Sequence, residues 1–191
     1  MKRRIASLMV HTSPLEQAGQ GDAGGINIYV VESAKKMAEQ GIEVDIFTRA
    51  EKDGFEDAVE IAPGVVVLHL VAAPVSKLSK EELPAHIGAL MSAFSHHQLG
   101  KPHNYYDAIH SHYWISGQLG WMISERTGVP LIHTMHTMAK VKNRNLADGE
   151  NSEPLVREIG EQQIVDNSSG LIANTDAEAA ALVSLYGANP E

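Results

Sequence analysis

The segment "GINIYVVESAKKMAEQGIEVDIFT" (25–48) places a helical pattern directly before a strand pattern. Its first part carries apolar residues at helical spacing, namely Ile26, Val30, Ala34 and Met37. Gly41 is a typical helix stop, and residues 43–48 predict a strand. The preceding segment "RIASLMV" (4–10) predicts another strand, buried on both faces. Strand, helix and strand in this order predict two parallel strands joined by a crossover helix.

The same alternation continues along the chain. Further strands are predicted over 65–71, 107–111, 129–134 and 170–174. Further helices are predicted from the Ser79/Glu82 capping pair to about His97, and over 116–128, 152–167 and 176–187, the last with Thr175 and Glu178 in capping-box spacing. We therefore predict one α/β domain over residues 1–191. It is a Rossmann-like, doubly wound, mainly parallel sheet with helices on both faces.

Composition limits the classes of partner. The 191 residues are 43% hydrophobic and 20% charged, as in an ordinary globular domain. The net charge of −9 argues against nucleic acid as a partner, and the absence of cysteine excludes disulfides and thiolate chemistry. No apolar run is long enough to span a membrane, and the N-terminus lacks the apolar core of a secretion signal. We expect a cytoplasmic protein with small-molecule ligands.

A glycine-rich loop follows the first predicted strand. Its Gly19-x-Gly21-x-x-Gly24 spacing matches a dinucleotide fingerprint, but it begins too far from the strand. No acidic residue ends the second strand, although Arg49 there could serve the 2′-phosphate of NADP. A flexible loop is a further alternative. We favour a phosphate site at Gly24 and Gly25, where a helix N-terminus offers free N–H groups.

Histidines end two neighbouring strands of the predicted sheet. His110 and His112 share one strand face and could hold a metal, but no third ligand accompanies them at metal spacing. We therefore expect His110 and His133 to be satisfied core or rim residues. His112 and His136 lie at the edge of the sheet where ligands bind, and they are candidates for sugar or phosphate contacts.

Several motifs together resemble one enzyme family. They are "HTSPLEQAGQGDAGGINIYV", "GIEVDIFTR", "LSKEELP", "IHSHYWISGQLGW", "PLIHTMHT", "VKN" and "REIGEQQIVDN". From end to end the chain is similar to the N-terminal half of family-4 retaining glycosyltransferases of the GT-B fold. The similarity is greatest to members that use UDP-N-acetylglucosamine and 1D-myo-inositol 3-phosphate in the first step of mycothiol biosynthesis in actinobacteria. Sucrose synthases and sucrose-phosphate synthases share some of these motifs.

The resemblance implies a set of site residues. The positions that hold the acceptor phosphate are Lys80, Tyr113, Thr137 and Arg157. Asn27 and His136 match positions near the inositol ring and the transferred sugar, and His136 is the candidate for a catalytic role. Gly25, beside Gly24, matches the glycine whose backbone approaches the donor diphosphate. Two cations, a phenol and a hydroxyl suit a small dianion.

The resemblance also implies how such an enzyme works. The anomeric carbon keeps its configuration through front-face attack, with no enzymic nucleophile, no metal and no cofactor. The nucleotide-sugar-binding domain is absent from these residues, so we expect the isolated chain to be inactive. Homodimerisation is left open. A noncatalytic phosphopolyol-binding domain and an NADP-dependent reductase remain as alternatives.

Overall fold

A computed structural model describes residues 2–16, 19, 24–147 and 149–190. These residues form a seven-stranded sheet in the order β3-β4-β2-β1-β5-β6-β7. The strands are β1 (Arg4–Leu8), β2 (Glu43–Arg49), β3 (Ala58–Ala62), β4 (Val65–Leu70), β5 (Ala108–His112), β6 (Leu131–Thr134) and β7 (Gly170–Ile172). Every neighbouring pair is parallel except β3 and β4. The mainly parallel sheet of the prediction is confirmed.

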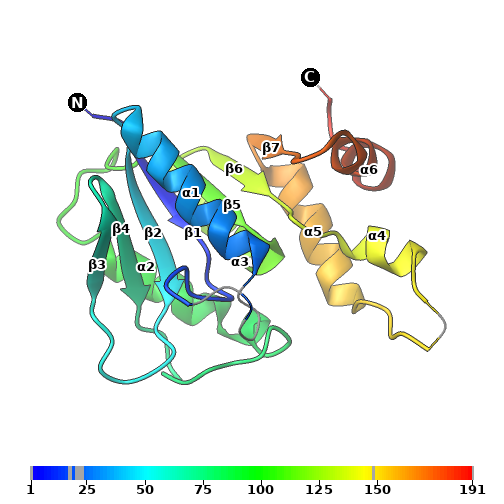
Figure 1. Ribbon diagram of the computed structural model, residues 1–191, viewed down its shortest axis with the longest axis horizontal. Coiled ribbons are helices and arrows are strands. Elements are labelled where there is room, and N and C mark those ends of the chain that lie inside the picture. The colour runs from blue at the N-terminus through cyan, green and yellow to red at the C-terminus, as the bar shows by residue number, and fades with distance from the viewer. Residues whose placement is uncertain (1, 17–18, 20–23, 148, 191) are drawn as a thin grey trace.

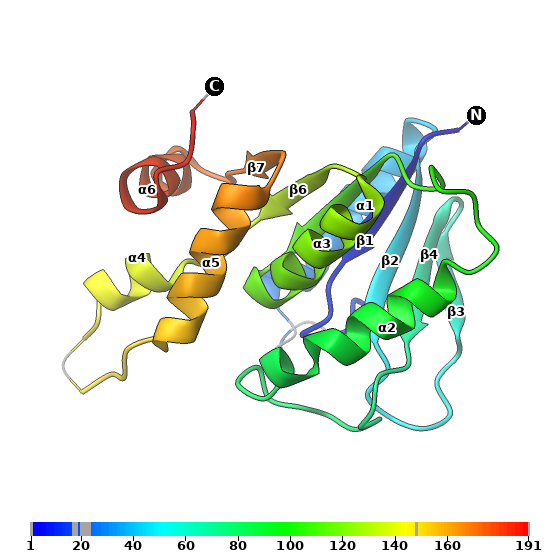
Figure 2. The same ribbon diagram turned by 180° about the vertical axis from the view of Figure 1, so that it is seen from behind.

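Helices cover both faces of this sheet. They are α1 (Gly25–Glu39), the 3-10 turn η1 (Leu83–His86), α2 (Ile87–His97), α3 (Trp114–Thr127), α4 (Ala139–Arg144), α5 (Leu155–Asn167) and α6 (Asp176–Tyr186). The helix α1 lies on one face, and α2 and α3 lie on the other (Figures 1 and 2). The helices α4, α5 and α6 lie beside β6 and β7 (Figure 1). Among the described residues, no helix has both the length and the apolar character that crossing a membrane requires.

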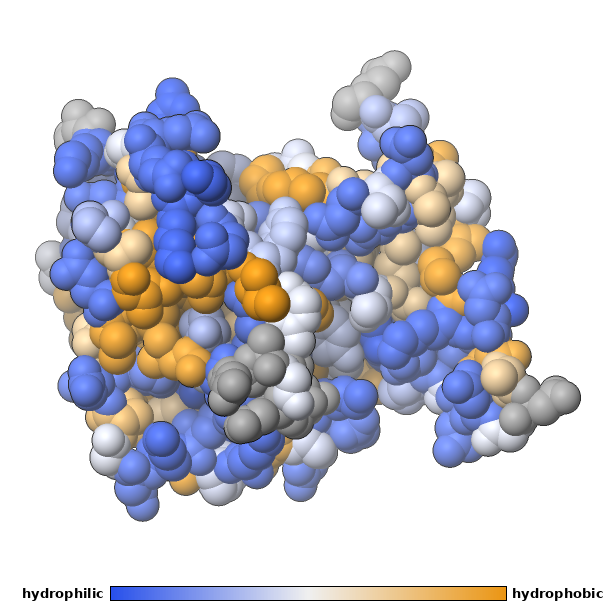
Figure 3. All heavy atoms as spheres, viewed as in Figure 1, coloured by the Kyte–Doolittle hydropathy of each residue, from blue (hydrophilic) through white to orange (hydrophobic). Residues whose placement is uncertain are grey.

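The helix α1 packs against β2 and β4 as its apolar spacing predicts. Val30 and Ala34 are fully buried in a cluster with Val44, Ile46 and Val67. Gly41 has a φ of +82°, and the N–H of Ile42 donates to the carbonyl of Met37, which closes the helix end. Figure 3 shows apolar side chains around the N-terminal half of α1 and hydrophilic ones over its C-terminal end.

On the other face, α3 is the central helix and α5 packs closely on it. A Cβ at Gly117 of α3 would lie 2.5 Å from Ile164 Cδ1, and one at Gly160 of α5 would lie 3.0 Å from the Trp114 ring. The two helices approach this closely because both positions lack side chains. Arg157 lies one turn before Gly160, so this contact fixes its distance from the sheet.

Three parts of the fold differ from the sequence prediction, and one is the short helix α4, which was not expected. The strand β3 was not expected, although Pro63 and Gly64 form the tight turn of a β3–β4 hairpin, with Gly64 at a φ of +81°. The capping pair is present, since the N–H of Ser79 donates to Glu82 Oε2 at 2.9 Å. It stabilises a turn rather than an α-helix, because Pro84 follows and α2 begins only at Ile87.

Candidate functional site

The carboxyl ends of β1, β5 and β6 converge where the strand order reverses beside β1. His11 lies in the segment after β1, and Tyr113 directly follows β5, with 4.5 Å between their ring centres. His136 lies two residues after β6, and its ring is 5.0 Å from that of Tyr29 on α1. Segments far apart in the sequence therefore meet at this edge of the sheet, and we call the cluster of His11, Tyr29, Tyr113 and His136 with its neighbours the edge site.

Backbone strain is concentrated in the edge site. Tyr113 has a φ of 70° and His136 a φ of 61°, and they are the only non-glycine residues in the described part of the chain with positive φ. Such conformations cost roughly 1–3 kcal/mol each and persist where the surrounding structure imposes them. The strained positions coincide with the ends of β5 and β6, as expected at a functional site.

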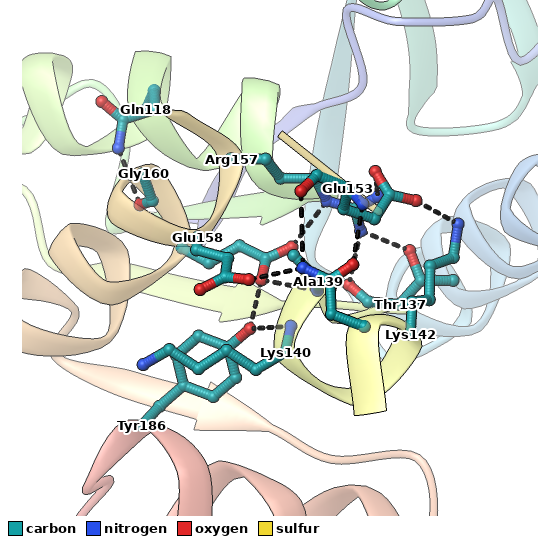
Figure 4. A network of polar contacts seen from close by, with 12 residues as sticks. Gln118, Thr137, Ala139, Lys140, Lys142, Glu153, Arg157, Glu158, Gly160 and Tyr186 are labelled. Carbon is teal, nitrogen blue, oxygen red and sulfur yellow. Dashed lines mark hydrogen bonds and ion pairs between the residues drawn. The ribbon is translucent and has the colours of Figure 1, made fainter. Parts of the chain in front are cut away.

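Arg157 is buried beside the edge site, with 2% of its surface exposed. Its Nε donates to Glu161 Oε1 at 2.8 Å, and its Nη1 lies 2.8 Å from Glu153 Oε2. Its Nη2 donates to Thr137 at two points, the hydroxyl at 2.9 Å and the carbonyl at 3.2 Å (Figure 4). These contacts hold the guanidinium in a single orientation.

Tyr113 completes this side of the edge site. Its ring centre lies 5.0 Å from Arg157 Cζ, a cation–π distance. Burial raises the pKa of its phenol, although the charge of Arg157 opposes that shift. The phenol is therefore protonated at neutral pH and can donate to an anion. The structure brings Tyr113, Thr137 and Arg157 together.

Lys80 lies in an exposed turn before η1. Burial lowers the pKa of His11 to about 3, and the charges of His136, Arg157 and Lys80 add to this lowering. Among the described contacts, none joins Lys80 to Tyr113, Thr137 or Arg157.

His11 is a residue of this site that the sequence analysis missed. Its ring is partly buried, and its Nδ1 has no hydrogen-bond partner among the described residues. Its low pKa leaves the imidazole neutral at neutral pH. The available signal was its position directly after the first strand of a doubly wound sheet, where ligands gather.

His110, His112 and His133 lie buried behind His136. His112 Nδ1 lies 3.1 Å from His136 Nε2, and the rings of His110 and His112 are 4.0 Å apart. His110 Nε2 bonds to the Thr134 hydroxyl at 2.9 Å. His133 is fully buried, and its Nδ1 bonds to the hydroxyl of Ser111 at 2.7 Å. His110 and His133 are buried as expected, but His133 is not fully satisfied, because its Nε2 has no hydrogen-bond partner among the described residues.

His136 itself offers an uncharged imidazole to the edge site. Burial lowers its pKa to about 4. It can therefore donate or accept a hydrogen bond at neutral pH without carrying a charge. Among the described residues, no group of three histidine or carboxylate side chains is placed to hold a metal ion.

The glycines at the start of α1 lie in open space. A Cβ at Gly24 or Gly25 would meet no described atom within 4 Å, and neither residue has a positive φ. Neither packing nor backbone conformation therefore requires glycine at these positions. The phosphate site predicted at Gly24 and Gly25 stays a prediction.

Asn27 has a structural task that the sequence did not indicate. Its side chain is buried and accepts from the N–H of Gly24 at 3.0 Å. Its amide donates to the carbonyl of Ser13 at 2.7 Å and to the hydroxyl of Thr12 at 3.3 Å. The predicted contact of Asn27 with the acceptor ring stays a prediction. The contacts present fix the segment after β1 to the start of α1.

The residue proposed for an NADP phosphate has other partners. Arg49 is 1% exposed and donates to the carbonyls of Ser76 at 2.7 Å and Pro74 at 3.3 Å. It also lies 3.2 Å from Glu51. These contacts bind β2 to the segment after β4. Of the fingerprint glycines, Gly21 lies outside the described residues.

Comparison with known proteins places this geometry in a family. A D-inositol 3-phosphate glycosyltransferase 2 of Catenulispora acidiphila is 55% identical over 190 residues, covering 100% of this chain and 44% of that protein. A D-inositol 3-phosphate glycosyltransferase of Streptomyces griseus is also 55% identical, covering 98% of this chain and 40% of that protein. The chain thus spans less than half the length of these curated relatives.

A solved structure and a family model also match this chain. The structure of sucrose-phosphate synthase from Thermosynechococcus elongatus matches with a TM-score of 0.89 at 28% identity, covering 97% of this chain and 45% of that one. The model of the glycosyl transferase 4-like domain matches residues 24–191. The structural match confirms the predicted fold class. Because the family model matches most of the chain, the chain belongs to the glycosyl transferase 4-like domain family.

Proposed function

We propose that this chain is the acceptor-binding half of a retaining glycosyltransferase. The whole enzyme would transfer N-acetylglucosamine from UDP-N-acetylglucosamine to 1D-myo-inositol 3-phosphate. The 55% identity to D-inositol 3-phosphate glycosyltransferases supports this substrate pair. The remaining length of such relatives would carry the nucleotide site, and a cytoplasmic location fits these substrates.

The single observation that carries the proposal is the grouping around Arg157. Arg157 contacts both Thr137 and Tyr113, and the charge of Lys80 contributes to the lowered pKa of the neighbouring His11. A guanidinium, an ammonium, a hydroxyl and a phenol provide the donors that a phosphate dianion accepts. This side of the edge site would therefore hold the acceptor phosphate.

The opposite side of the edge site would hold the donor. Gly24 and Gly25 allow the backbone of α1 to approach a diphosphate, and the helix dipole stabilises its charge. The neutral imidazole of His136 would contact the transferred sugar between the two phosphates. Binding both substrates at the edge site supplies orientation for front-face attack, in which the leaving diphosphate accepts the proton of the acceptor hydroxyl. No residue of this chain is assigned as a nucleophile.

Removing a cation from the phosphate side should weaken acceptor binding. We expect Arg157→Ala to reduce the affinity for 1D-myo-inositol 3-phosphate by roughly ten-fold to over a hundred-fold, because a charge-assisted contact to phosphate is worth about 1.5–3 kcal/mol. Lys80→Ala should weaken it by about ten-fold without loss of stability, because Lys80 is exposed. Calorimetric titration of this chain measures both effects.

The matched control is Lys36→Ala, which removes one positive charge from an exposed position on α1. Its affinity should equal that of the wild type. Unphosphorylated inositol should bind all variants equally weakly. If Lys80→Ala and Arg157→Ala both retain full affinity for the phosphate, the proposed acceptor site is wrong.

A side chain at Gly25 should obstruct the donor without disturbing the fold. In the enzyme that carries this chain together with its nucleotide-binding half, we expect Gly25→Val to lower turnover by about ten-fold or more, because it displaces a diphosphate stabilised by N–H groups. The thermal midpoint and acceptor affinity should stay unchanged, since no described atom lies near the new side chain.

Gly88→Val is the control for this substitution. Gly88 lies in the first turn of α2, also with no described atom within 4 Å of an added Cβ. It should keep full turnover. Equal losses of stability and acceptor affinity in Gly25→Val would instead identify Gly25 as a structural residue.

A sucrose-phosphate-synthase-like acceptor is the second candidate, supported by the TM-score of 0.89. Titrating the chain with 1D-myo-inositol 3-phosphate, fructose 6-phosphate and NADPH separates the candidates. Selective binding of inositol phosphate supports the proposal, whereas preference for fructose 6-phosphate supports the second candidate. Binding of NADPH alone would favour the reductase alternative.

A further inference from the structure

The guanidinium of Arg157 has only one nitrogen left for a ligand. Nε donates to Glu161, and both N–H groups of Nη2 can be satisfied by the hydroxyl and carbonyl of Thr137. Only Nη1 remains, and the carboxylate of Glu153 lies on it at 2.8 Å. Nη1 carries two N–H groups and the Glu153 carboxylate occupies one of them, so a phosphate that binds Nη1 through both must displace Glu153.

Glu161 is not the partner that yields. It is fully buried, and its Oε2 accepts from the N–H of Ala139 at 2.8 Å and from the hydroxyl of Tyr186. Moving this carboxylate would leave three donors without an acceptor. It fixes the orientation of Arg157 in any state of the site.

Glu153 is placed to leave. Its side chain is 21% exposed and lies on the segment between α4 and α5. Its second oxygen, Oε1, lies 2.7 Å from Lys142 Nζ, so the carboxylate bridges two cations (Figure 4). The backbone N–H of Glu153 donates to the Asn143 side chain at 2.7 Å, which holds the segment while the carboxylate moves.

The charge of Glu153 supports an exchange of anions. Partial burial opposes ionisation, but the hydrogen bond from Lys142 and the charge of Arg157 together lower the pKa of Glu153. The group is thus a carboxylate at neutral pH and would repel a phosphate dianion beside it. Lys142 remains as its partner when the contact with Arg157 breaks.

We propose that Glu153 is an internal competitor of the acceptor: its carboxylate occupies Arg157 Nη1 in the empty site and is exchanged for the acceptor phosphate. This inference rests on the proposed acceptor site. The exchange gives selectivity for dianions, because a ligand must interact with Nη1 more strongly than the resident carboxylate does. It also keeps the buried cation paired when no substrate is bound.

Glu153→Gln tests the inference, with Glu158→Gln as its matched control. Glu158 lies five residues away, contacts the same Asn143 and carries the same charge. It has no contact with Arg157 among the described interactions. We expect Glu153→Gln to bind both inorganic phosphate and 1D-myo-inositol 3-phosphate about ten-fold more tightly than the wild type. Glu158→Gln should change neither affinity by more than about two-fold.

The two titrants separate the inference from the proposed function. If inorganic phosphate binds Glu153→Gln no more tightly than the wild type, or is not bound at all, the exchange is refuted. Tighter phosphate binding with no binding of inositol phosphate by any variant would support the exchange and contradict the proposed acceptor. The double variant Glu153→Gln/Arg157→Lys lacks the forked guanidinium. If this variant loses the tighter phosphate binding of Glu153→Gln, the exchange takes place at Arg157 Nη1.

Discussion

Replacing Glu161 by alanine should lower the free energy of unfolding by about 3–5 kcal/mol. The substitution leaves the buried guanidinium of Arg157 without its permanent partner, and it removes the acceptor of Ala139 N–H and of the Tyr186 hydroxyl. Arg157 then keeps only its ion pair with the partly exposed Glu153, and breaking a buried ion pair is far more costly than losing an exposed one. Denaturant unfolding at pH 7 measures the difference.

Glu158→Ala is the control for this prediction. It removes a carboxylate from the same helix but leaves every contact of Arg157 in place. We expect a loss below about 1 kcal/mol there. A loss in Glu161→Ala no larger than in Glu158→Ala would show that Arg157 gains little from its buried partner.

Acidification should destabilise the chain steeply, well above the pH at which carboxylates protonate. Burial lowers the pKa of His110 to about 4 and of His133 to about 3, and it holds the pKa of His112 well below its ordinary value. Below pH 6.5 the unfolded chain binds protons at these histidines while the folded chain does not. Stability therefore falls as the pH drops from about 6.5 toward 4.

The size of this effect follows from the number of protons. Each histidine contributes up to ~1.4 kcal/mol per pH unit within that window, so these three alone give roughly 3–4 kcal/mol between pH 6 and pH 5. His11 and His136, whose pKa values burial lowers to about 3 and about 4, add to this loss. Denaturant unfolding at several pH values checks the slope. His133→Gln should reduce the slope of the unfolding free energy against pH by the contribution of about one proton. His103→Gln, at an exposed position, should leave the slope unchanged. A flat profile between pH 6.5 and pH 5 would contradict the prediction.

Local patterns were sufficient to predict most of the fold. The helical spacing before Gly41 predicted α1, and the apolar runs predicted six of the strands, because burial on one or both faces leaves a periodic trace in the sequence. The strand β3 left a weaker trace, since it is a partly exposed edge strand. The helix α4 has six residues and too few turns to show a period.

The edge site was predictable in part. Resemblance indicated Tyr113, Thr137 and Arg157, and the topology explains why strand ends far apart in sequence can meet. The partners of Arg157 were not predictable, because Glu153 and Glu161 look like ordinary surface charges at helical spacing from it. Only the packing of α5 on α3 turns that side of the helix inward, where carboxylates become partners of a buried cation.

The close contact between α3 and α5 sets the mechanical tolerance of the edge site. Because Gly117 and Gly160 leave no room for even a Cβ, the side chains of Ile164 and Trp114 fill the contact between the two helices, and α5 has little freedom to slide. Arg157 lies one turn from that contact, so a displacement of α5 would also shift the guanidinium. The position of Arg157 is thus determined within the core.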